Sequence, residues 1–321
     1  MHTWQQFSEQ FNERFSINHF PDTPATLYDP NRYFLALGGK RIRPLLVLMG
    51  NELFDEVVPD AWLVANAVEL FHNFTLIHDD MMDQAALRRG KPTVHEKFGW
   101  STALLAGDVM LVKAYDYLNQ VKKDYAHRVM YLFNQTAAEV CEGQQLDMDF
   151  EKQQVVSLEQ YLHMIRLKTS VLLAASLKMG SIIGGASRGN QDHLYAFGEN
   201  LGIAFQIQDD YLDAFGDPAK FGKEVGGDIR QNKKTFLAIH VQEVANPAQK
   251  AKLTQLAAEN GPEKVAGVLQ IMRDCGVDAW ARNLKDTYLN KALFHLEEIA
   301  VVSTRKKSLE ALAGFLVGRD Y

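Results

Sequence analysis

Apolar residues recur every three or four positions in nearly every long segment of this chain, and this period constrains the fold most strongly. Residues three or four apart lie on one face of a helix, whereas a half-buried strand alternates at every second residue. Within 62–83, for example, Val64, Val68 and Phe71 form one apolar stripe. Alternating runs rich in β-branched residues are scarce. The pattern predicts an all-α protein.

The same period gives a set of expected helices, separated by turn signals. Paired glycines such as Gly38-Gly39, Gly184-Gly185 and Gly226-Gly227 mark turns between them. No linker rich in Ser, Gly or Pro divides the chain, so we expect one all-α domain over residues 1–321. The expected helices cover 4–17, 41–54, 62–83, 103–120, 125–141, 158–180, 193–214, 235–258, 261–275, 278–297 and 306–318.

Composition excludes several classes of protein. The net charge of −6 and the isoelectric point near 5.9 disfavour a nucleic-acid-binding protein, which usually carries a basic face. Two cysteines are too few for a disulfide framework, so we expect a reducing, cytoplasmic setting. The N-terminal segment lacks the basic and apolar regions of a secretory signal. Because no apolar run approaches the ~18 residues of a membrane span, we expect a soluble protein.

One acidic motif occurs twice, each time at the end of an apolar helical segment. DDMMD occupies 79–83 and DDYLD occupies 209–213. Residues four apart in a helix lie ~6 Å apart along its axis and point in similar directions. Asp79 and Asp83 therefore direct two carboxylates to one place, where their repulsion favours binding of a cation. Oxygen ligands suit Mg²⁺. Acidic decoration of solvated helix ends is the alternative, but two matches by chance are improbable.

Basic residues accompany these acidic motifs. A site built from aspartates and Mg²⁺ keeps open coordination positions that phosphate groups fill. In GGKRIRP, at 38–44, Lys40 and Arg43 lie beside a turn and an expected helix start, where backbone N–H groups also favour anions. Taken singly, each basic residue is more often a solvated surface charge. Their grouping instead predicts phosphate binding; the further candidates are Arg88, Arg89, Lys168, Lys223, Lys233 and Lys234.

Together these motifs resemble those of the trans-isoprenyl diphosphate synthases, also called polyprenyl synthetases. The similar segments, in the order of that family, are GGKRIRP, LIHDDMMD with LRRG, EGQQLD, LKTS, FQIQDDYLD and FGKEVGGDIRQNKKT, from about Gly38 to Thr235. The resemblance implies an isoprenoid-synthase helical bundle around a central cavity. It also implies a homodimeric transferase that condenses isopentenyl diphosphate with an allylic diphosphate such as dimethylallyl, geranyl or farnesyl diphosphate.

The resemblance also implies roles for individual residues. Three Mg²⁺ ions would be held by Asp79, Asp83 and Asp209. The allylic diphosphate would be bound by Arg88, Lys168 and Lys223, with Lys233 nearby. Isopentenyl diphosphate would be bound by Lys40, Arg43, His72 and Arg89. The developing allyl cation would be faced by Thr169, Gln206 and the Lys168 carbonyl. Supporting roles, such as orienting metal-bound water or neighbouring cations, would fall to Asp80, Asp210, Asp213, Gln144 and Asp147.

Product length is predicted from the residues that precede Asp79. Phe74, five positions earlier, carries a ring that would block a lengthening chain, and Thr75 beside it is small. This combination resembles the twenty-carbon geranylgeranyl pattern, which Leu104, Met110 or Tyr115 on a neighbouring helix could change. A farnesyl diphosphate synthase and a non-catalytic partner subunit are the alternatives. A terpene cyclase is disfavoured by DDYLD and GGKRIRP, and a magnesium-buffering protein leaves the basic residues unexplained.

Overall fold

The computed structural model describes residues 1–15, 19–217, 225–259 and 261–318. Among these residues the chain is helical apart from loops and one small hairpin, so the all-α prediction is confirmed. The chain divides into two compact units. Unit 1 comprises Met1–Gln135, Ala175–Leu194 and Ala300–Leu309; unit 2 comprises Thr136–Ala174, Tyr195–Ile299 and Glu310–Tyr321. The single-domain organisation stays a prediction.

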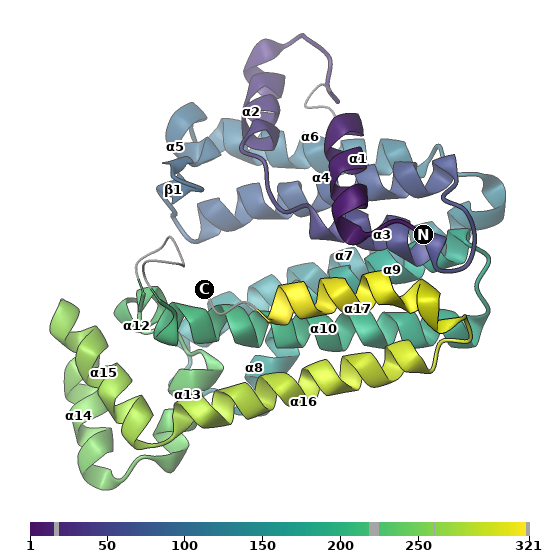
Figure 1. The fold of residues 1–321 in the computed structure, drawn as a ribbon. Helices are drawn as coiled ribbons and strands as arrows, with labels where there is room; N and C mark the ends of the chain where they lie inside the picture. Colours follow the sequence, from purple (N-terminus) through teal and green to yellow (C-terminus); the bar gives the residue numbers. More distant parts are fainter. Residues whose placement is uncertain (16–18, 218–224, 260, 319–321) are drawn as a thin grey trace. The chain divides into compact units, whose positions relative to one another are not determined.

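Unit 1 is built around α4 (Pro59–Met82) and α6 (Trp100–Leu118), which run side by side (Figure 1). Val64, Val68 and Met110 are fully buried, as their helical spacing predicts. The other elements of unit 1 are α1 (Trp4–Arg14), α2 (Ala25–Ala36), α3 (Ile42–Glu52), β1 (Leu87–Arg88), β2 (Lys91–Pro92), α5 (Val94–Phe98), the N-terminal part of α7 (Lys123–Lys152), most of α9 (Val171–Ile183) and the first turns of α10 (Arg188–Phe215) and α17 (Ser303–Val317).

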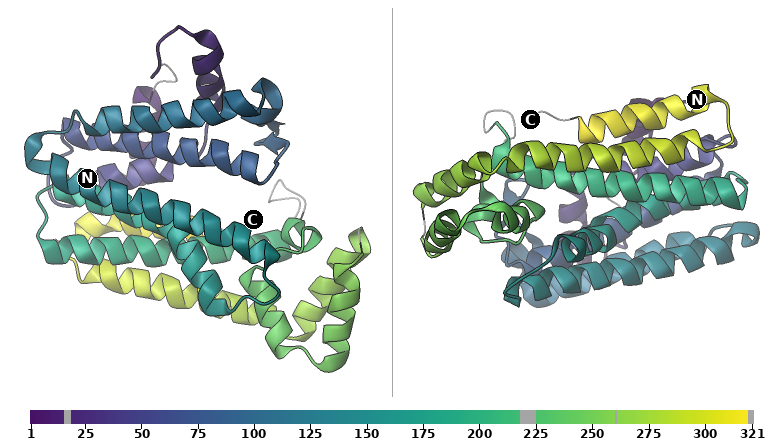
Figure 2. Two further views of the ribbon diagram at one scale, coloured as in Figure 1. Left: turned by 180° about the vertical axis from the view of Figure 1, so that it is seen from behind. Right: turned by 90° about the horizontal axis from the view of Figure 1, so that it is seen from below.

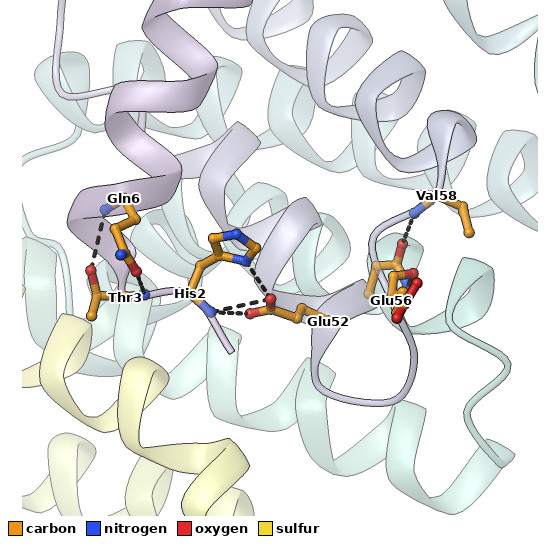
Figure 3. Close-up of polar contacts among 7 residues, drawn as sticks. His2, Thr3, Gln6, Glu52, Glu56 and Val58 are labelled. Carbon is orange, nitrogen blue, oxygen red and sulfur yellow. Dashed lines mark hydrogen bonds and ion pairs between the residues drawn. The ribbon is translucent and has the colours of Figure 1, made fainter.

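The N-terminus is hydrogen-bonded to the C-terminal end of α3 (Figure 3). Thr3 caps α1: its Oγ1 accepts from the Gln6 N–H at 3.2 Å, and the Gln6 side chain accepts from the Thr3 N–H at 2.8 Å. The His2 backbone N–H donates to Glu52 Oε2 at 2.9 Å. In the loop before α4, the Val58 N–H donates to the Asn51 side chain at 3.1 Å. These bonds fix the start of α4, whose other end carries the first acidic motif.

Unit 2 packs around the C-terminal part of α10 (Arg188–Phe215). Figure 2 shows α16 (Val277–Glu297) running alongside it, and the Tyr211 hydroxyl donates to Asp278 Oδ1 at 2.6 Å. The other elements contributing to unit 2 are α8 (Leu158–Ile165), the π-helix η1 (Arg166–Ser170), α9 (Val171–Ile183), α12 (Gly227–Arg230), α13 (Phe236–Val244), α14 (Pro247–Ala257), α15 (Pro262–Asp274) and α17 (Ser303–Val317).

The expected helix over 235–258 is wrong, because α13 and α14 are separate helices. Ala245 is extended at the break, with φ −66° and ψ 143°. Asn246 then caps α14, and Pro247 occupies its first turn. Proline is tolerated there because the backbone N–H that it lacks would have no partner within the helix. The helices α2 and α5 were not expected, and α7 continues well beyond residue 141. Within the described residues, no helix is both long and apolar enough to cross a membrane.

Candidate active site

In unit 1 the first acidic motif closes α4. Asp83 is the C-cap residue, and its backbone N–H donates to the Asp79 carbonyl at 2.8 Å, so the two aspartates lie one helical turn apart. Asp83 is exposed and Asp79 is partly exposed. Asp80 points elsewhere: it is 3 % exposed, and its Oδ2 accepts from Arg88 Nε at 2.7 Å. The motif thus combines two carboxylates that are at least partly exposed with a partly buried ion pair.

The hairpin β1–β2 presents the two arginines of the LRRG run. Arg88 is paired with Lys91, and Arg89 and Gly90 form a two-residue turn with φ 52° and 73°. Positive φ at both positions is the type I′ geometry that fits the twist of a hairpin. The Arg89 guanidinium lies against Gly39, since a Cβ on Gly39 would be 2.8 Å from Arg89 Nη2. The GG turn therefore makes room for Arg89, and Lys40 follows it as an exposed residue.

His72 lies at the centre of a cationic cluster in unit 1. Arg43 Nη1 is 3.0 Å from His72 Nε2. Burial lowers the His72 pKa well below its usual value, and the nearby charges of Arg43, Arg88, Arg89 and Arg41 lower it further. Neutral His72 can therefore accept from Arg43. Burial also lowers the pKa of Arg43 to about 10, which leaves it protonated at neutral pH. A concentration of positive charge of this kind attracts anions.

Arg41 and Glu69, which sequence analysis missed, form an ion pair beneath this cluster. Arg41 Nη1 and Glu69 Oε1 are 2.8 Å apart, and the two side chains are 7 % and 5 % exposed. Burial raises the pKa of Glu69, which the charge of Arg41 opposes. The Asn73 amide also donates to Glu69 Oε1, at 2.8 Å. A charged residue on an otherwise apolar helix, three positions before His72, was the available signal in the sequence.

In unit 2 the LKTS motif lies in the π-helix η1, which carries Lys168 and Thr169. Single π-helical turns inside α-helices occur frequently at functional sites. Two glycines allow neighbouring helices to approach this turn: a Cβ on Gly143 would lie 2.3 Å from the Lys168 backbone N, and one on Gly202 would lie 2.6 Å from Ser170 Cα. Close packing on both α7 and α10 therefore fixes the backbone of the motif.

The second acidic motif is held by uncharged donors. Buried Asp210 accepts from the Tyr161 hydroxyl, and its Oδ1 accepts from the Gln206 amide at 2.9 Å. Burial raises the pKa of Asp210 to about 7, and the charge of Asp228 adds to the effect. Asp213 Oδ2 accepts from the Asp228 backbone N–H at 3.0 Å. Asp209, the first residue of the motif, is partly exposed.

Around η1, several of the expected site residues contact one another. Thr169 Oγ1 donates to Gln206 Oε1 at 3.2 Å, and Lys168 Nζ donates to Asp147 Oδ2 at 2.6 Å. The Gln144 amide is buried, and both its oxygen and its nitrogen lack a hydrogen-bond partner in the described part of the chain. Buried polar atoms in that state ordinarily bind water or an ion.

The two adjacent lysines of the KKT run have different partners. Lys234 Nζ donates to the Phe150 carbonyl at 2.6 Å and to the Glu151 carbonyl at 3.2 Å, so it caps the C-terminal end of α7. Lys233 Nζ lies 3.8 Å from Asp228 Oδ1 and is exposed. This division favours Lys233 over Lys234 as a ligand-binding residue. Lys223 lies outside the described residues.

The donor set of the first motif suits a hard divalent cation, because Asp79 and Asp83 supply carboxylate oxygens one turn apart and Asp83 faces solvent. Among the described residues, no group of three or more His, Cys, Asp or Glu side chains gathers at one point. Mg²⁺ at the first motif would take its remaining ligands from water or substrate oxygens, as Mg²⁺ commonly does.

A cavity of about 700 Å³ lies in unit 2 beside the second acidic motif. Asp210, Asp213, Asp228 and Lys233 contribute to its wall, together with aliphatic side chains of α13, α14 and α15. Lys168, Thr169 and Gln206 are not among the described residues that line it, although Asp210, which accepts from Gln206, is. The central cavity that the resemblance implies stays a prediction.

Below the first motif, α4 contributes to a run of aromatic rings. The Phe74 and Phe71 ring centroids are 5.6 Å apart, and Phe71 contacts Phe133 at 5.1 Å. Phe133 in turn contacts Tyr115 at 5.3 Å, in an edge-to-face arrangement. Phe71 is 1 % exposed, whereas Phe74 is only partly buried. Phe74 and Tyr115 are thus the members of this run that keep partial access to their surroundings, and Phe74 is the one on α4.

Comparison with known proteins identifies the family to which the chain belongs. Residues 24–275 match the model of the polyprenyl synthetase family. The short chain isoprenyl diphosphate synthase of Methanocaldococcus jannaschii is 37% identical over 95% of this chain and 93% of the relative. The geranylgeranyl diphosphate synthase of Saccharolobus solfataricus is 37% identical over 96% of this chain and 95% of the relative. A crystal structure of a geranylgeranyl pyrophosphate synthase shares 45% identity with a TM-score of 0.94, covering 100% of both chains.

The fold is therefore that of the all-α isoprenyl diphosphate synthases. The chain belongs to the polyprenyl synthetase family. Its relatives differ in their named product, since the Natronomonas pharaonis geranylfarnesyl diphosphate synthase is 33% identical over 98% of this chain and 96% of the relative.

Proposed function

We propose that this chain is a geranylgeranyl diphosphate synthase that requires Mg²⁺. The coarser activity follows from family membership: the chain is a trans-prenyltransferase that condenses isopentenyl diphosphate with an allylic diphosphate to a short-chain prenyl diphosphate. The observation that carries the proposal is the cationic cluster around neutral His72, in the same unit as the first acidic motif. Such a cluster suits a diphosphate, which carries several negative charges at neutral pH.

Isopentenyl diphosphate binds to the cationic cluster of unit 1 in this proposal. Arg43 and Arg89 provide guanidinium groups, Lys40 provides an exposed ammonium, and His72 supports Arg43 as a neutral acceptor. The buried Arg41–Glu69 pair, next to this group, offsets part of the repulsion among its cations. These groups hold the nucleophilic alkene in place and take no part in proton transfer.

As the resemblance implies, the allylic diphosphate would be bound by Arg88, Lys168 and Lys223, with Lys233 nearby, and Mg²⁺ would be held by Asp79, Asp83 and Asp209. Bound Mg²⁺ would neutralise negative charge on the departing diphosphate. Arg88, fixed by Asp80, and Lys168, fixed by Asp147, are charges already oriented before the reaction. Preorganised charges of this kind stabilise a leaving group without reorganisation. Asp80 supports Arg88 through the ion pair described above, and Asp213 and Gln144 would have the supporting roles that the resemblance implies.

Thr169 and Gln206 stabilise the allylic cation by the orientation of their oxygen atoms. The Thr169 hydroxyl donates to Gln206 Oε1, and the Gln206 amide donates to Asp210. These two hydrogen bonds fix which atoms of Thr169 and Gln206 act as donors and which as acceptors. The π-helical turn positions the Lys168 carbonyl, which adds a further partial negative charge. Attack by the isopentenyl alkene forms the new carbon–carbon bond, and the proton that is then lost passes to diphosphate. No side-chain nucleophile takes part.

Phe74 sets the product length in this proposal. Its ring joins the aromatic run of unit 1 and lies five residues before Asp79. Thr75 is small, and its hydroxyl donates to the His72 carbonyl at 2.8 Å, which keeps it against its own helix. A product of about twenty carbons is supported by two relatives, which are named a geranylgeranyl and a geranylfarnesyl diphosphate synthase.

The direct test is to size the products. Purified protein with Mg²⁺ is supplied with isopentenyl diphosphate and with dimethylallyl, geranyl or farnesyl diphosphate in turn. We expect a twenty-carbon product that disappears with Asp79→Ala or with chelation of the metal. A fifteen-carbon end product would favour a farnesyl diphosphate synthase and contradict the role of Phe74. Failure of the folded protein to condense any pair would favour a partner subunit without activity of its own.

We further propose that the protein is a homodimer, with α6 at the interface. Leu105 and Val112 lie seven positions apart on α6, hence on one side of it, and are 55% and 59% exposed. Large exposed apolar side chains grouped in this way mark interaction surfaces. Sedimentation is expected to give a dimer that the double substitution Leu105→Glu with Val112→Glu converts to a monomer. A monomeric wild type would overturn this proposal.

A further inference from the structure

The residue immediately before the first acidic motif, His78, has no role in the site described above. It lies on the same face of α4 as Phe74, four positions later, and the two rings meet edge to face with centroids 4.8 Å apart. Its side chain is only 16% exposed. Its Nε2 lies 3.2 Å from the Leu104 carbonyl of α6, and the imidazole N–H donates there. His78 therefore links Phe74 to the neighbouring helix.

A glycine of α6 provides the space for this imidazole. A Cβ on Gly107 would lie 2.2 Å from His78 Nε2 and 2.6 Å from its Cδ2, which is far closer than real Cβ contacts. Gly107 is fully enclosed within the α4–α6 contact. No positive φ requires glycine at this position in α6, so close approach of the His78 ring is its physical reason. The histidine and the glycine fit each other as a pair.

We propose that His78 is a specificity-positioning residue, held against Gly107, which fixes the Phe74 ring and so the length of the product. This inference rests on the proposed role of Phe74 and deepens it. Phe74 contacts Phe71 on one side and His78 on the other, so its ring has a defined orientation. Without the imidazole, a void opens beside Phe74, and a growing apolar chain can push the ring into it. Product length then depends on a contact outside the diphosphate-binding groups.

Substitutions of His78 and of Gly107 are expected to change the product length in opposite directions. His78→Ala is expected to raise the fraction of products longer than twenty carbons at least ~5-fold, because Phe74 gains room. In Gly107→Ala, the added methyl group displaces the imidazole toward Phe74, so the fraction of fifteen-carbon product is expected to rise. In the double variant, that methyl group has no imidazole to displace. The product distribution of the double variant should therefore equal that of His78→Ala alone, which is a non-additive outcome specific to this contact.

The assay measures product length at matched conversion, with the folded state of each variant confirmed by thermal unfolding. Gly189→Ala, a helical glycine of α10 with no atom within 4 Å of the added Cβ, is the matched control. Asp108→Asn tests whether the weak pairing with His78, at 4.0 Å, matters; we expect the wild-type distribution. If His78→Ala does not fold, Gly107→Ala decides the question, since it leaves the histidine in place.

A parallel Phe74→Ala variant separates this inference from the proposed function. Longer products with Phe74→Ala but wild-type lengths with the His78 and Gly107 variants would overturn the positioning role and leave the proposed function intact. Wild-type lengths with Phe74→Ala would overturn the role of Phe74, and that of His78 with it. Additive effects in the double variant would also contradict the proposal.

Discussion

The two acidic motifs share one sequence pattern, yet their second aspartates have opposite kinds of partner. Asp80 is buried and pairs with the guanidinium of Arg88 at 2.7 Å. Asp210 is also buried but accepts hydrogen bonds from the Tyr161 hydroxyl and the Gln206 amide, which are uncharged donors. Burial without a paired cation raises the pKa of Asp210 to about 7.

The difference shows that the motif defines a backbone spacing, whereas residues outside the motif define its electrostatics. In unit 1 the aspartate orients a cation that is available for an anionic substrate. In unit 2 the aspartate orients an amide, which in turn accepts from Thr169. The first motif is therefore organised around charge, and the second around directed dipoles.

The largest expected effect distinguishes these two aspartates directly. Asp80→Asn removes the charge that orients Arg88, and we expect kcat/KM to fall by ~100-fold. Asp210→Asn keeps an oxygen that can accept from Tyr161, so the expected loss is smaller, ~10-fold or less. Steady-state kinetics with each allylic substrate measure both. Asp286→Asn on the exposed surface of α16 is the control. Equal losses for the two motif variants would contradict the distinction.

A second comparison uses the adjacent glycines of the GG turn. Both have positive φ, +74° for Gly38 and +149° for Gly39, so alanine is strained at either position. Only at Gly39 would the added Cβ meet the Arg89 guanidinium, at 2.8 Å. Gly39→Ala is therefore expected to raise the KM for isopentenyl diphosphate by ~10-fold, whereas Gly38→Ala affects mainly stability. A similar rise in KM for both variants would show that backbone strain, and not Arg89, is responsible.

The pH dependence of stability tests the cationic cluster. Folded His72 has a pKa well below its ordinary value of 6.5, so the unfolded chain binds a proton there that the folded chain does not. The free energy of unfolding should therefore decrease as pH falls below about 6.5, and this contribution is absent above that pH. His72→Gln retains an acceptor for Arg43 and does not titrate. Denaturant unfolding should show a shallower acid slope for this variant; an unchanged slope would contradict the assignment.

The smallest effect concerns the two lysines that follow α12. Lys234 binds the last carbonyls of α7, so Lys234→Ala is expected to lower the free energy of unfolding by ~1 kcal/mol. Lys233 is exposed and near Asp228, so Lys233→Ala should lower activity and leave stability nearly unchanged. Chemical denaturation and kinetics of both variants measure the contrast. The reverse pattern would exchange the roles of the two residues.

Much of the fold was predictable because helical periodicity is strong in this chain. The buried stripe of α4 was expected from the sequence. The break between α13 and α14 was missed, although Asn246 followed by Pro247 is a helix-start signal. Helix α2 was missed because its Pro30 reads as a helix breaker, although it lies inside the helix and is buried.

The motif residues of the site were predictable from the sequence, but the residues that contact them were not. Lys168 and Thr169 were expected, but the π-helical turn that carries them and the glycines that contact it were not. A π-helical turn depends on packing against other helices, which local sequence does not encode. Tyr161 and Glu69 were missed for the same reason, since their partners are defined by tertiary contact.

The most direct test is whether the cations proposed for isopentenyl diphosphate, such as Arg89, and those proposed for the allylic diphosphate, such as Lys168, serve different substrates. Arg89→Ala in unit 1 and Lys168→Ala in unit 2 are compared by measuring KM for isopentenyl diphosphate and for farnesyl diphosphate. We predict that Arg89→Ala raises KM for isopentenyl diphosphate by ~10- to 100-fold with little change for farnesyl diphosphate, and that Lys168→Ala does the reverse. Equal increases for both substrates in both variants would contradict the division of the site.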